Sequence, residues 1–206
     1  RPGLTVDGIR RHTARTDARL SRRRVDCVTE SITIAGVPAK WFGAPGLAER
    51  NGTLLYLHGG AWCVHLPGMY GAFAARLSAA TGMRVLLVDY RLAPEHPFPA
   101  AVDDCLAVYR ALVAGPTGRP RVIAGDSAGG NLVLAAMLAL RERGLPLPIA
   151  AVLMSAWTDL AANGASYVTH AEADPIHQRP MILALAKSYL GEQGDPYDPL
   201  VSPLYA

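Results

Sequence analysis

A serine surrounded by small residues, in the segment GDSAGG at 125–130, joins a short apolar run to a strongly apolar segment. The run at 121–125 is typical of a buried strand, and residues 127–143 predict a helix that stays apolar almost all round until Arg141. Where a strand turns directly into a helix, the two cross so closely that glycines are needed on either side of the serine. The segment therefore predicts an α/β fold in which Ser127 lies in a strained turn, with its hydroxyl projecting beyond the sheet.

Further apolar runs alternate with helical stretches along most of the chain. Strands are expected at 53–58, 84–89 and 149–155, and helices near 70–80 and 100–114. This alternation, and the nearly continuous apolar character of the strands, favour a mostly parallel central sheet with helices on both faces.

Segments near both ends of the chain depart from this alternation. Residues 25–34 and 37–43 predict a hairpin, because the turn residues Ala35-Gly36 separate two strand-like runs. Later in the chain, the polar and irregular stretch 156–179 precedes a helix at 180–190, which starts with a proline and ends before a glycine.

A second motif, HGGAW at 58–62, follows the predicted strand at 53–58. Glycines let backbone N–H groups point at a bound group without obstruction, and two or three such donors stabilise the negative charge that develops on a carbonyl oxygen during acyl transfer. His58 is interpreted as a residue that braces this loop. A base that serves Ser127 is expected after the serine in a chain of this kind, not before it.

Other segments accompany the two motifs: DYRLAPE at 89–95, FPAA at 98–101, WTDL at 157–160 and DPLVSPL at 198–204. In this order they resemble the hormone-sensitive-lipase-like family of α/β-hydrolases, especially its bacterial carboxylesterases and lipases. The resemblance covers residues 25–206. It implies an α/β-hydrolase core at 25–206 without its C-terminal strands. It also implies a partial helical cap, made by an N-terminal segment at 1–24 and an insertion near 156–190.

The resemblance also implies a role for each residue of the two motifs. Ser127 attacks the carbonyl carbon of an ester, and Asp126 braces the turn that holds the serine. The oxyanion hole is assigned to four residues: Gly59, Gly60, Ala61 and Ala128. Gly59 shapes the loop, and the N–H groups of the other three are the donors. Ala61 replaces the glycine that many members carry, which keeps the donor and adds a methyl group near the acyl site.

The family's triad acid and base follow the segment at 198–204, so neither is expected in this chain, which ends at Ala206. His170 and His177 follow Ser127 in the sequence, but they fall in the part that resembles the cap, where no base is expected. Four aspartates have no better claim: Asp159, Asp174, Asp195 and Asp198. We therefore expect the polypeptide to be incomplete, with the final strands, the acid and the base outside it.

Several neighbours of the motifs are expected to serve the fold. Cys63 is interpreted as a small apolar filler. Three acidic residues are expected to be structural: Glu95, Asp103 and Asp104. Four residues fit either an acyl pocket or ordinary core: Trp62, Met69, Tyr70 and Phe73.

Positive charge is concentrated at the N-terminus. The chain has a net charge of +3, yet residues 1–24 hold eight arginines against two aspartates. Arg11, Arg15 and Arg19 recur every four residues, which predicts the solvated face of an N-terminal helix. A transient contact with an anionic membrane or lipid surface is the alternative. Nucleic acid is not expected as a partner, because no binding motif accompanies the charge.

The composition is that of a globular protein, because half of the residues are apolar and 18% are charged. The three cysteines show no metal-ligand spacing, so neither disulfides nor a metal or organic cofactor is expected. No apolar run is as long as a membrane span. We expect a cytoplasmic location. Because the chain opens with Arg1 rather than Met, a signal segment that has been removed is the alternative. The sequence is also compatible with a homodimer.

Three functions fit these observations. The favoured one is hydrolysis of short- to medium-chain acyl esters, as a small-molecule carboxylesterase or lipase, through an acyl-enzyme on Ser127. An aryl formamidase or amidase is the second, because HGG-x-W also resembles the loop of kynurenine-formamidase-like hydrolases. The third is a catalytically incomplete binding protein, since the family includes a receptor that lost the triad and kept the pocket. The segments at 89–95 and 125–131 favour the esterase.

Overall fold

The structure, a computed structural model, describes residues 5–20, 26–47, 52–116 and 119–206. Its centre is a six-stranded sheet with the strand order β1-β2-β4-β3-β5-β6. The strands are β1 (Val28–Ile34), β2 (Val37–Gly43), β3 (Thr53–Leu57), β4 (Arg84–Val88), β5 (Val122–Asp126) and β6 (Ala150–Met154). The last four of these pair in parallel, whereas β1 with β2 and β2 with β4 pair antiparallel. The mostly parallel sheet predicted from the sequence is therefore confirmed.

The hairpin of β1 and β2 extends the sheet beyond its parallel part. Ala35 and Gly36 join the two strands with φ angles of 51° and 83°, as a two-residue hairpin turn requires at both central positions. The pairing runs without interruption from Ile34 opposite Val37 to Val28 opposite Gly43. The hairpin prediction is confirmed, with the first strand starting at Val28.

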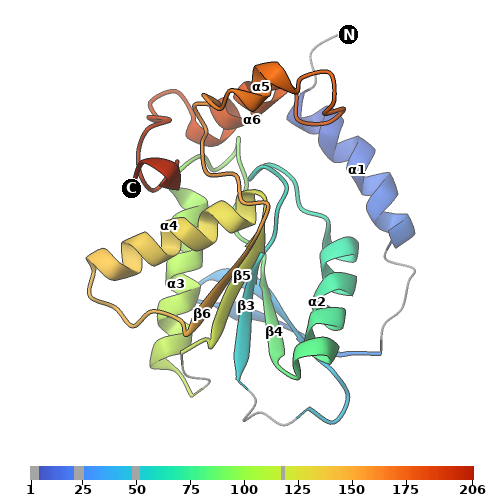
Figure 1. Cartoon of the computed structure of the whole chain (residues 1–206). Helices are drawn as coiled ribbons and strands as arrows, with labels where there is room; N and C mark the ends of the chain where they lie inside the picture. The colour runs from blue at the N-terminus through green and yellow to red at the C-terminus, as the bar shows by residue number, and fades with distance from the viewer. Residues whose placement is uncertain (1–4, 21–25, 48–51, 117–118) are drawn as a thin grey trace.

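Helices cover both faces of the sheet, as Figure 1 shows for α2 (Pro67–Thr81) on one side and α3 (Ala100–Ala114) with α4 (Ala128–Glu142) on the other. Successive side chains of a strand point to opposite faces. In β3, Leu54 and Tyr56 therefore pack in the cluster under α2, whereas Leu55 and Leu57 pack in the cluster under α3 and α4. All four are buried, which explains why the strand is apolar at four successive positions rather than at alternate ones.

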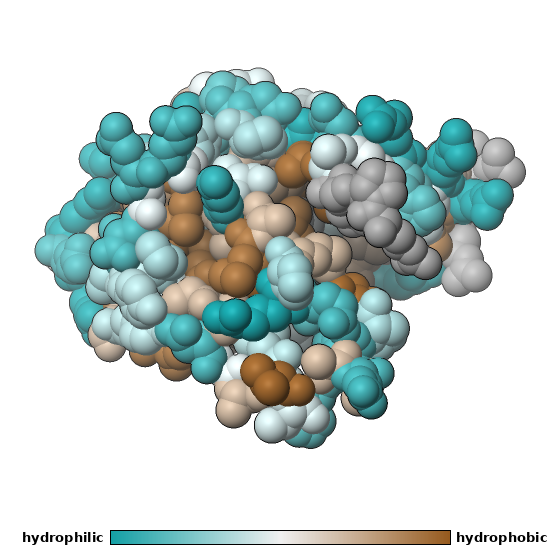
Figure 2. Space-filling model, turned by 90° about the horizontal axis from the view of Figure 1, so that it is seen from above, coloured by the Kyte–Doolittle hydropathy of each residue, from teal (hydrophilic) through white to brown (hydrophobic). Residues whose placement is uncertain are grey.

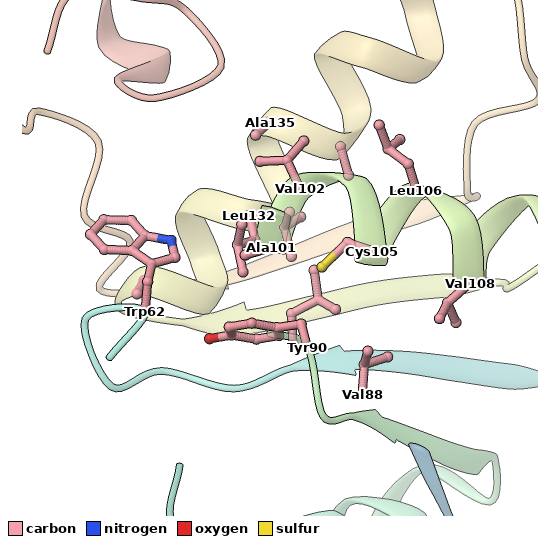
Figure 3. Packing of buried hydrophobic residues seen from close by; sticks show 14 of the residues in the cluster. Trp62, Val88, Tyr90, Ala101, Val102, Cys105, Leu106, Val108, Leu132 and Ala135 are labelled. Carbon is pink, nitrogen blue, oxygen red and sulfur yellow. The ribbon is translucent and has the colours of Figure 1, made fainter. Parts of the chain in front are cut away.

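The larger cluster fills the space between the sheet and helices α3 and α4. Figure 3 shows Val88 and Tyr90 from the end of β4 facing Val102, Cys105 and other residues of α3, with Leu132 of α4 beside them. Ten of the residues of α4 are buried. The all-round apolar pattern of this helix thus reflects its position between the sheet and α3.

The observed helix boundaries coincide with the capping residues better than with the ends of the apolar pattern. Helix α2 begins at Pro67, three residues before its apolar stretch, because a proline in the first turn lacks an N–H that would have no partner there. It ends at Thr81 and is capped by Gly82, whose φ of 66° is the left-handed conformation that favours glycine, and whose N–H donates to the carbonyl of Ser78.

Three helices lie outside the layers around the sheet: α1 (Val6–Leu20), α5 (Ser166–Thr169) and α6 (Arg179–Leu190). Figure 1 shows α5 and α6 beyond the carboxyl ends of the parallel strands, and α1 beside α2. A short 3-10 helix follows at Pro203–Tyr205. No helix in the described ranges has the length and apolarity needed to cross a membrane.

The basic N-terminal segment is helical where the structure describes it. Arg11, Arg15 and Arg19 are all exposed, so the predicted solvated face of α1 is confirmed. Arg22 to Arg24, and the boundary expected between residues 24 and 25, lie outside the described residues.

Candidate active site

Ser127 lies in a sharp turn between β5 and α4. Its φ of 51° and ψ of −119° are unfavourable for a residue with a side chain. Backbone hydrogen bonds hold it there: its N–H donates to Met154, and its carbonyl accepts from Asn131 and Trp157, at 2.9, 3.1 and 3.1 Å. Ser127 is half-buried, whereas Ala128 behind it is fully buried. The side chain thus reaches the surface of the molecule from a fixed backbone.

Glycines on either side of the serine allow the strand and the helix to cross. A Cβ on Gly125 would lie 2.5 Å from the carbonyl group of Gly129 and 2.8 Å from the carbonyl oxygen of Leu57. A Cβ on Gly129 would overlap that same oxygen and would lie 2.6 Å from the carbonyl oxygen of His58. Helix α4 therefore starts in contact with the end of β3, next to the HGG motif.

The HGG motif forms a tight turn after β3. Gly60, Ala61 and Trp62 have φ angles of 120°, 52° and 56°. The carbonyl of Gly60 accepts the N–H groups of Cys63 and Val64 at 3.0 and 2.9 Å. Within the described residues, no acceptor takes a hydrogen bond from the N–H of Gly60 or Ala61. Two donors are thus available to a bound group.

The carboxylate of Asp126 ties this turn to the serine. Its Oδ1 accepts the N–H of Gly59 at 2.9 Å and the hydroxyl of Tyr56 at 2.8 Å, and its Oδ2 accepts the hydroxyl of Tyr70 at 2.8 Å. Burial and the nearby carboxylate raise the pKa of both tyrosines, so both remain donors. A Cβ on Gly59 would overlap Asp126 Oδ2 and would lie 2.8 Å from the Tyr70 hydroxyl. Gly59 therefore shapes the loop, and its N–H is already engaged.

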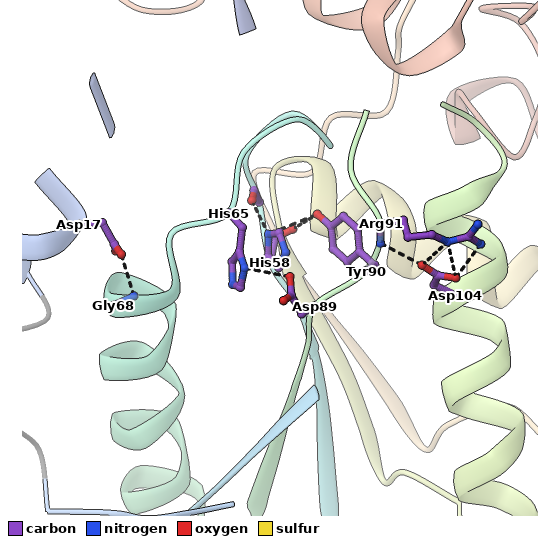
Figure 4. A network of polar contacts seen from close by, with 9 residues as sticks. Asp17, His58, His65, Gly68, Asp89, Tyr90, Arg91 and Asp104 are labelled. Atoms are coloured by element: carbon purple, nitrogen blue, oxygen red, sulfur yellow. Dashed lines mark hydrogen bonds and ion pairs between the residues drawn. The ribbon is translucent and has the colours of Figure 1, made fainter. Parts of the chain in front are cut away.

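His58 is held between two other rings. Figure 4 shows it between His65 and Tyr90; both neighbours stack on it at 4.3 Å between ring centroids, with 12° between the planes. Tyr90 also donates its hydroxyl to the His58 carbonyl at 2.6 Å, and His65 Nδ1 lies 2.9 Å from a carboxylate oxygen of Asp89. Burial, with a smaller effect of His65, lowers the pKa of His58 to about 3. A neutral, fully buried ring fits the bracing role predicted for His58.

These residues also form a cluster with metal-ligating atoms. In the described ranges, His58, His65 and Asp89 each offer one such atom, all within 4.8 Å of one another. The lone pairs of imidazole lie in the plane of the ring, and the two stacked rings are nearly parallel. A single ion cannot lie in both planes, so this arrangement does not suit a metal ion.

The other residues singled out in the sequence lie in buried clusters or in ion pairs. Trp62 is fully buried and stacks on Tyr189 of α6 at 4.1 Å between centroids. Within α2, Tyr70 is buried, whereas Met69 and Phe73 are half-buried. Cys63 is fully buried, and burial raises the pKa of its thiol to about 11. Asp104 binds Arg91 at 2.8 Å, and Glu95 binds Arg10 at 2.6 Å.

The two histidines that follow Ser127 are both exposed near α5. His170 Nδ1 lies 2.8 Å from the Thr169 hydroxyl, and His177 Nδ1 lies 3.2 Å from Asp174. Among the described residues, no imidazole forms a hydrogen bond with Ser127 Oγ. The geometry therefore gives neither histidine a place as its base.

A cavity of about 660 Å³ lies away from the serine, between the β1–β2 hairpin and α2. Its lining includes Cys27, Lys40, Phe42 and His65, and Ser127 does not line it. The strained serine turn and the donors of the HGG motif, rather than this cavity, mark the candidate site.

The tyrosines around Asp126 and the contact of Arg10 with the HGG turn were not predicted from the sequence. Tyr56 and Arg10 reach the site from positions 70 and 53 residues away from their partners. No local pattern joins residues so far apart. The one available signal for Tyr56 is a polar hydroxyl in an otherwise apolar strand, because a buried hydroxyl needs a partner.

Comparisons with known proteins agree with this geometry. Residues 54–206 match a family described as having the alpha/beta hydrolase fold. An acetyl-hydrolase of Streptomyces hygroscopicus is 42% identical over 177 residues, covering 84% of this chain and 58% of that protein. An esterase of Acinetobacter venetianus is 36% identical over 175 residues, covering 84% of this chain and 57% of that protein. The chain thus spans somewhat more than half the length of these relatives.

A solved structure is similar over the whole chain. It is the crystal structure of an esterase from the bacterial hormone-sensitive lipase family, with 42% sequence identity and a TM-score of 0.90, covering 100% of this chain and 69% of that one. The serine turn, the HGG turn and the sheet that joins them are therefore parts of a known architecture. This chain belongs to the α/β-hydrolases, in the family of the bacterial hormone-sensitive-lipase-type esterases.

Proposed function

We propose that the protein carrying this chain is a serine hydrolase of carboxylic esters, with Ser127 as its nucleophile. The observation that carries the proposal is the link through Asp126. This carboxylate precedes the serine and also binds the N–H of Gly59. The nucleophile and the free donors of Gly60 and Ala61 are thereby held in one unit, as acyl transfer requires.

The reaction follows from these positions. Ser127 Oγ adds to the ester carbonyl carbon while a base accepts its proton. The negative oxygen that forms is stabilised by the N–H groups of Gly60, Ala61 and Ala128, the last at the N-terminus of α4. Collapse of this intermediate expels the alcohol, which takes the proton from the base. Water, deprotonated by the same base, then releases the acid and restores the serine.

In this proposal the base and its acid partner come from outside these residues. His58 is neutral and enclosed by rings, and the exposed His170 and His177 bind their own neighbours. A protein with Ser127 and its donors but without a base would acylate slowly, because proton removal makes a large contribution to the rate.

Short- to medium-chain acyl esters are the proposed substrates. The compared relatives include an acetyl-hydrolase and esterases. The end of the molecule seen in Figure 2 gathers apolar residues at its centre, with hydrophilic residues around them. A small acyl group can enter such a surface while the alcohol part faces water.

Labelling by a fluorophosphonate tests the nucleophile directly. The natural protein that carries this chain is treated with the reagent, digested and analysed by mass spectrometry, with Ser127→Ala as the control. An adduct on Ser127 that disappears in the variant supports the proposal, and the absence of any adduct contradicts it. Rates on p-nitrophenyl butyrate and on an aryl formamide then identify the bond that is cleaved, and a strong preference for the formamide would make the protein an amidase.

A further inference from the structure

The turn formed by residues 60–64, which presents the proposed oxyanion donors, is strained. Ala61 and Trp62 both have left-handed φ angles, 52° and 56°, although neither is glycine. This conformation is unfavourable for a residue with a side chain, and it persists only where the surrounding contacts hold it. Relaxation of either residue would rotate the peptide groups and turn the N–H groups of Gly60 and Ala61 away from their common target. The contacts that hold this turn are therefore part of the catalytic geometry.

Two hydrogen bonds from other segments of the described chain hold backbone carbonyls of the turn. The N–H of Ala93 donates to the Trp62 carbonyl at 2.8 Å. The Nε of Arg10, in the distant helix α1, donates to the Cys63 carbonyl at 2.7 Å. The carbonyls of Trp62 and Cys63 are thus both fixed by donors from other parts of the chain.

Arg10 connects these two contacts through one rigid group. Besides Cys63, its guanidinium donates to the Ala93 carbonyl at 2.9 Å and to both carboxylate oxygens of Glu95, at 2.6 and 2.8 Å. The same side chain therefore fixes the turn and the segment that supplies the other anchor. A planar guanidinium has enough donors in a fixed fork to do this, whereas a lysine ammonium on a flexible stem does not.

The helix that carries Arg10 is itself fixed near its other end. Asp17, the one buried residue of the described helix α1, accepts the N–H groups of Gly68 and Met69 at 2.9 and 2.7 Å, at the start of α2. A carboxylate is favourable at a helix N-terminus because it satisfies free N–H groups and complements the helix dipole. Helix α1 is therefore attached at two places: to the 60–64 turn through Arg10, and through Asp17 to the start of α2, which follows this turn in the sequence.

We propose that Arg10 is a positioning residue for the oxyanion hole, acting through the Cys63 carbonyl on the N–H groups of Gly60 and Ala61. This inference rests on the proposed esterase function. It assigns to α1 a part in the reaction, although Arg10 itself does not touch the substrate. If Arg10 had a structural role only, its removal would lower the stability of the fold and would leave the chemical step unchanged in the protein that remains folded.

Steady-state kinetics distinguish these two roles. Arg10→Met and Arg10→Lys are compared with Arg15→Met, which removes an exposed arginine from the same helix, at a temperature where circular dichroism shows every variant to be folded. The natural protein that carries this chain is used, with p-nitrophenyl butyrate as substrate. We expect kcat to fall about tenfold or more in Arg10→Met with little change in KM, because misplaced donors affect the transition state more than binding. Arg10→Lys recovers part of the loss, and Arg15→Met keeps the parent kcat.

Hydrogen–deuterium exchange gives a readout that does not depend on turnover. Peptides covering 59–66 are expected to exchange faster in Arg10→Met than in the parent and in Arg15→Met. If the parent hydrolyses esters and Arg10→Met keeps its kcat, the positioning role is wrong. If the parent hydrolyses nothing, the proposed function fails, and exchange alone decides whether Arg10 holds the turn. Unchanged exchange in Arg10→Met overturns the inference in either case.

Discussion

At the scale of single residues, the candidate site depends on an acidic and a basic side chain that fix its geometry. Asp126 lies beside Ser127, the proposed nucleophile, but its oxygens accept hydrogen bonds from two tyrosines and a backbone N–H. His58 lies beside the 60–64 turn but remains neutral because it is buried. Both are side chains that elsewhere act as acids or bases, and here both fix geometry.

The substitution Gly59→Ala tests how closely Asp126 approaches the loop. The new methyl would overlap the carboxylate and crowd the Tyr70 hydroxyl, so the loop must move. We expect a loss of about 1–3 kcal/mol in the free energy of unfolding and a fall in esterase kcat. Urea denaturation and p-nitrophenyl butyrate hydrolysis measure the two effects.

Gly71→Ala provides the control for this substitution. It adds the same methyl inside α2, 3.4 Å from the nearest ring carbon of Phe42. Alanine is the better helix former, so this variant is expected to be at least as stable as the parent. Equal stability and activity for the two variants would show that the space around Gly59 is unimportant.

His58 makes the stability of the fold depend on pH. Its pKa is about 3 in the folded protein and close to its ordinary value of about 6.5 when unfolded. The unfolded state therefore gains a proton first as the pH falls below about 6.5, and the free energy of unfolding decreases. Between pH 7 and pH 5 we expect a loss of about 2 kcal/mol from this group.

The variant His58→Gln isolates this contribution. It lacks the titrating ring, so its unfolding free energy in urea should fall less between pH 7 and pH 5 than that of the parent. The difference between the two slopes, rather than either stability, is the measured quantity, because the substitution also disturbs the stack with Tyr90. Identical slopes would mean that protonation of the buried ring does not lower the free energy of unfolding.

At the scale of elements, α6 is joined to the 60–64 turn by aromatic rings. Tyr189 stacks on Trp62. Trp157 packs against Trp62 in a tilted arrangement, and Phe98 packs edge to face with Tyr189. The backbone adds a hydrogen bond of 2.7 Å from the Phe98 N–H to the Tyr189 carbonyl. A helix outside the layers of the sheet is thereby coupled to the residue that follows the proposed donors.

Tyr189 offers a test of this coupling. Its hydroxyl is buried without a hydrogen-bond partner among the described residues, so Tyr189→Phe is expected to be neutral or to stabilise by up to about 1 kcal/mol. Tyr189→Ala removes the stacked ring and is expected to cost about 3–5 kcal/mol. Thermal unfolding of both variants measures this, and destabilisation by Tyr189→Phe would reveal a partner for the hydroxyl.

Much of the element pattern could be predicted from the sequence, because it depends on local signals. The strand runs, the turn at Ala35-Gly36 and the glycines around Ser127 each encode a conformation within a few residues. The start of α2 was misplaced because the apolar pattern begins later than Pro67. Contacts such as Tyr56 with Asp126, or Arg10 with Cys63, could not be predicted, since they depend on how distant segments meet.

At the scale of the whole molecule, the two edges of the sheet differ. In the described chain each edge strand has one partner: β1 pairs antiparallel with β2 in the hairpin, whereas β6 pairs in parallel with β5. Ile149, Val152 and Leu153 at this edge are 65%, 46% and 42% exposed. An exposed apolar strand edge is a site where chains associate.

The 206-residue polypeptide, produced by itself, is therefore expected to self-associate in a concentration-dependent way. Val152→Lys places a charge on the edge and should shift the protein towards the monomer, as measured by sedimentation velocity. Val168→Lys is the matched control, because it adds the same charge at an exposed valine of α5. A parent that is monomeric at high concentration would contradict the expectation.

The hydrogen bonds of Asp126 have a consequence for the evolution of the family. One carboxylate serves Tyr56 of β3, Gly59 of the loop and Tyr70 of α2. A change at any one of these positions leaves a buried donor or acceptor unpaired, or a methyl group in occupied space. Aligned relatives should therefore show positions 56, 59, 70 and 126 changing together or not at all, while the exposed arginines of α1 vary freely.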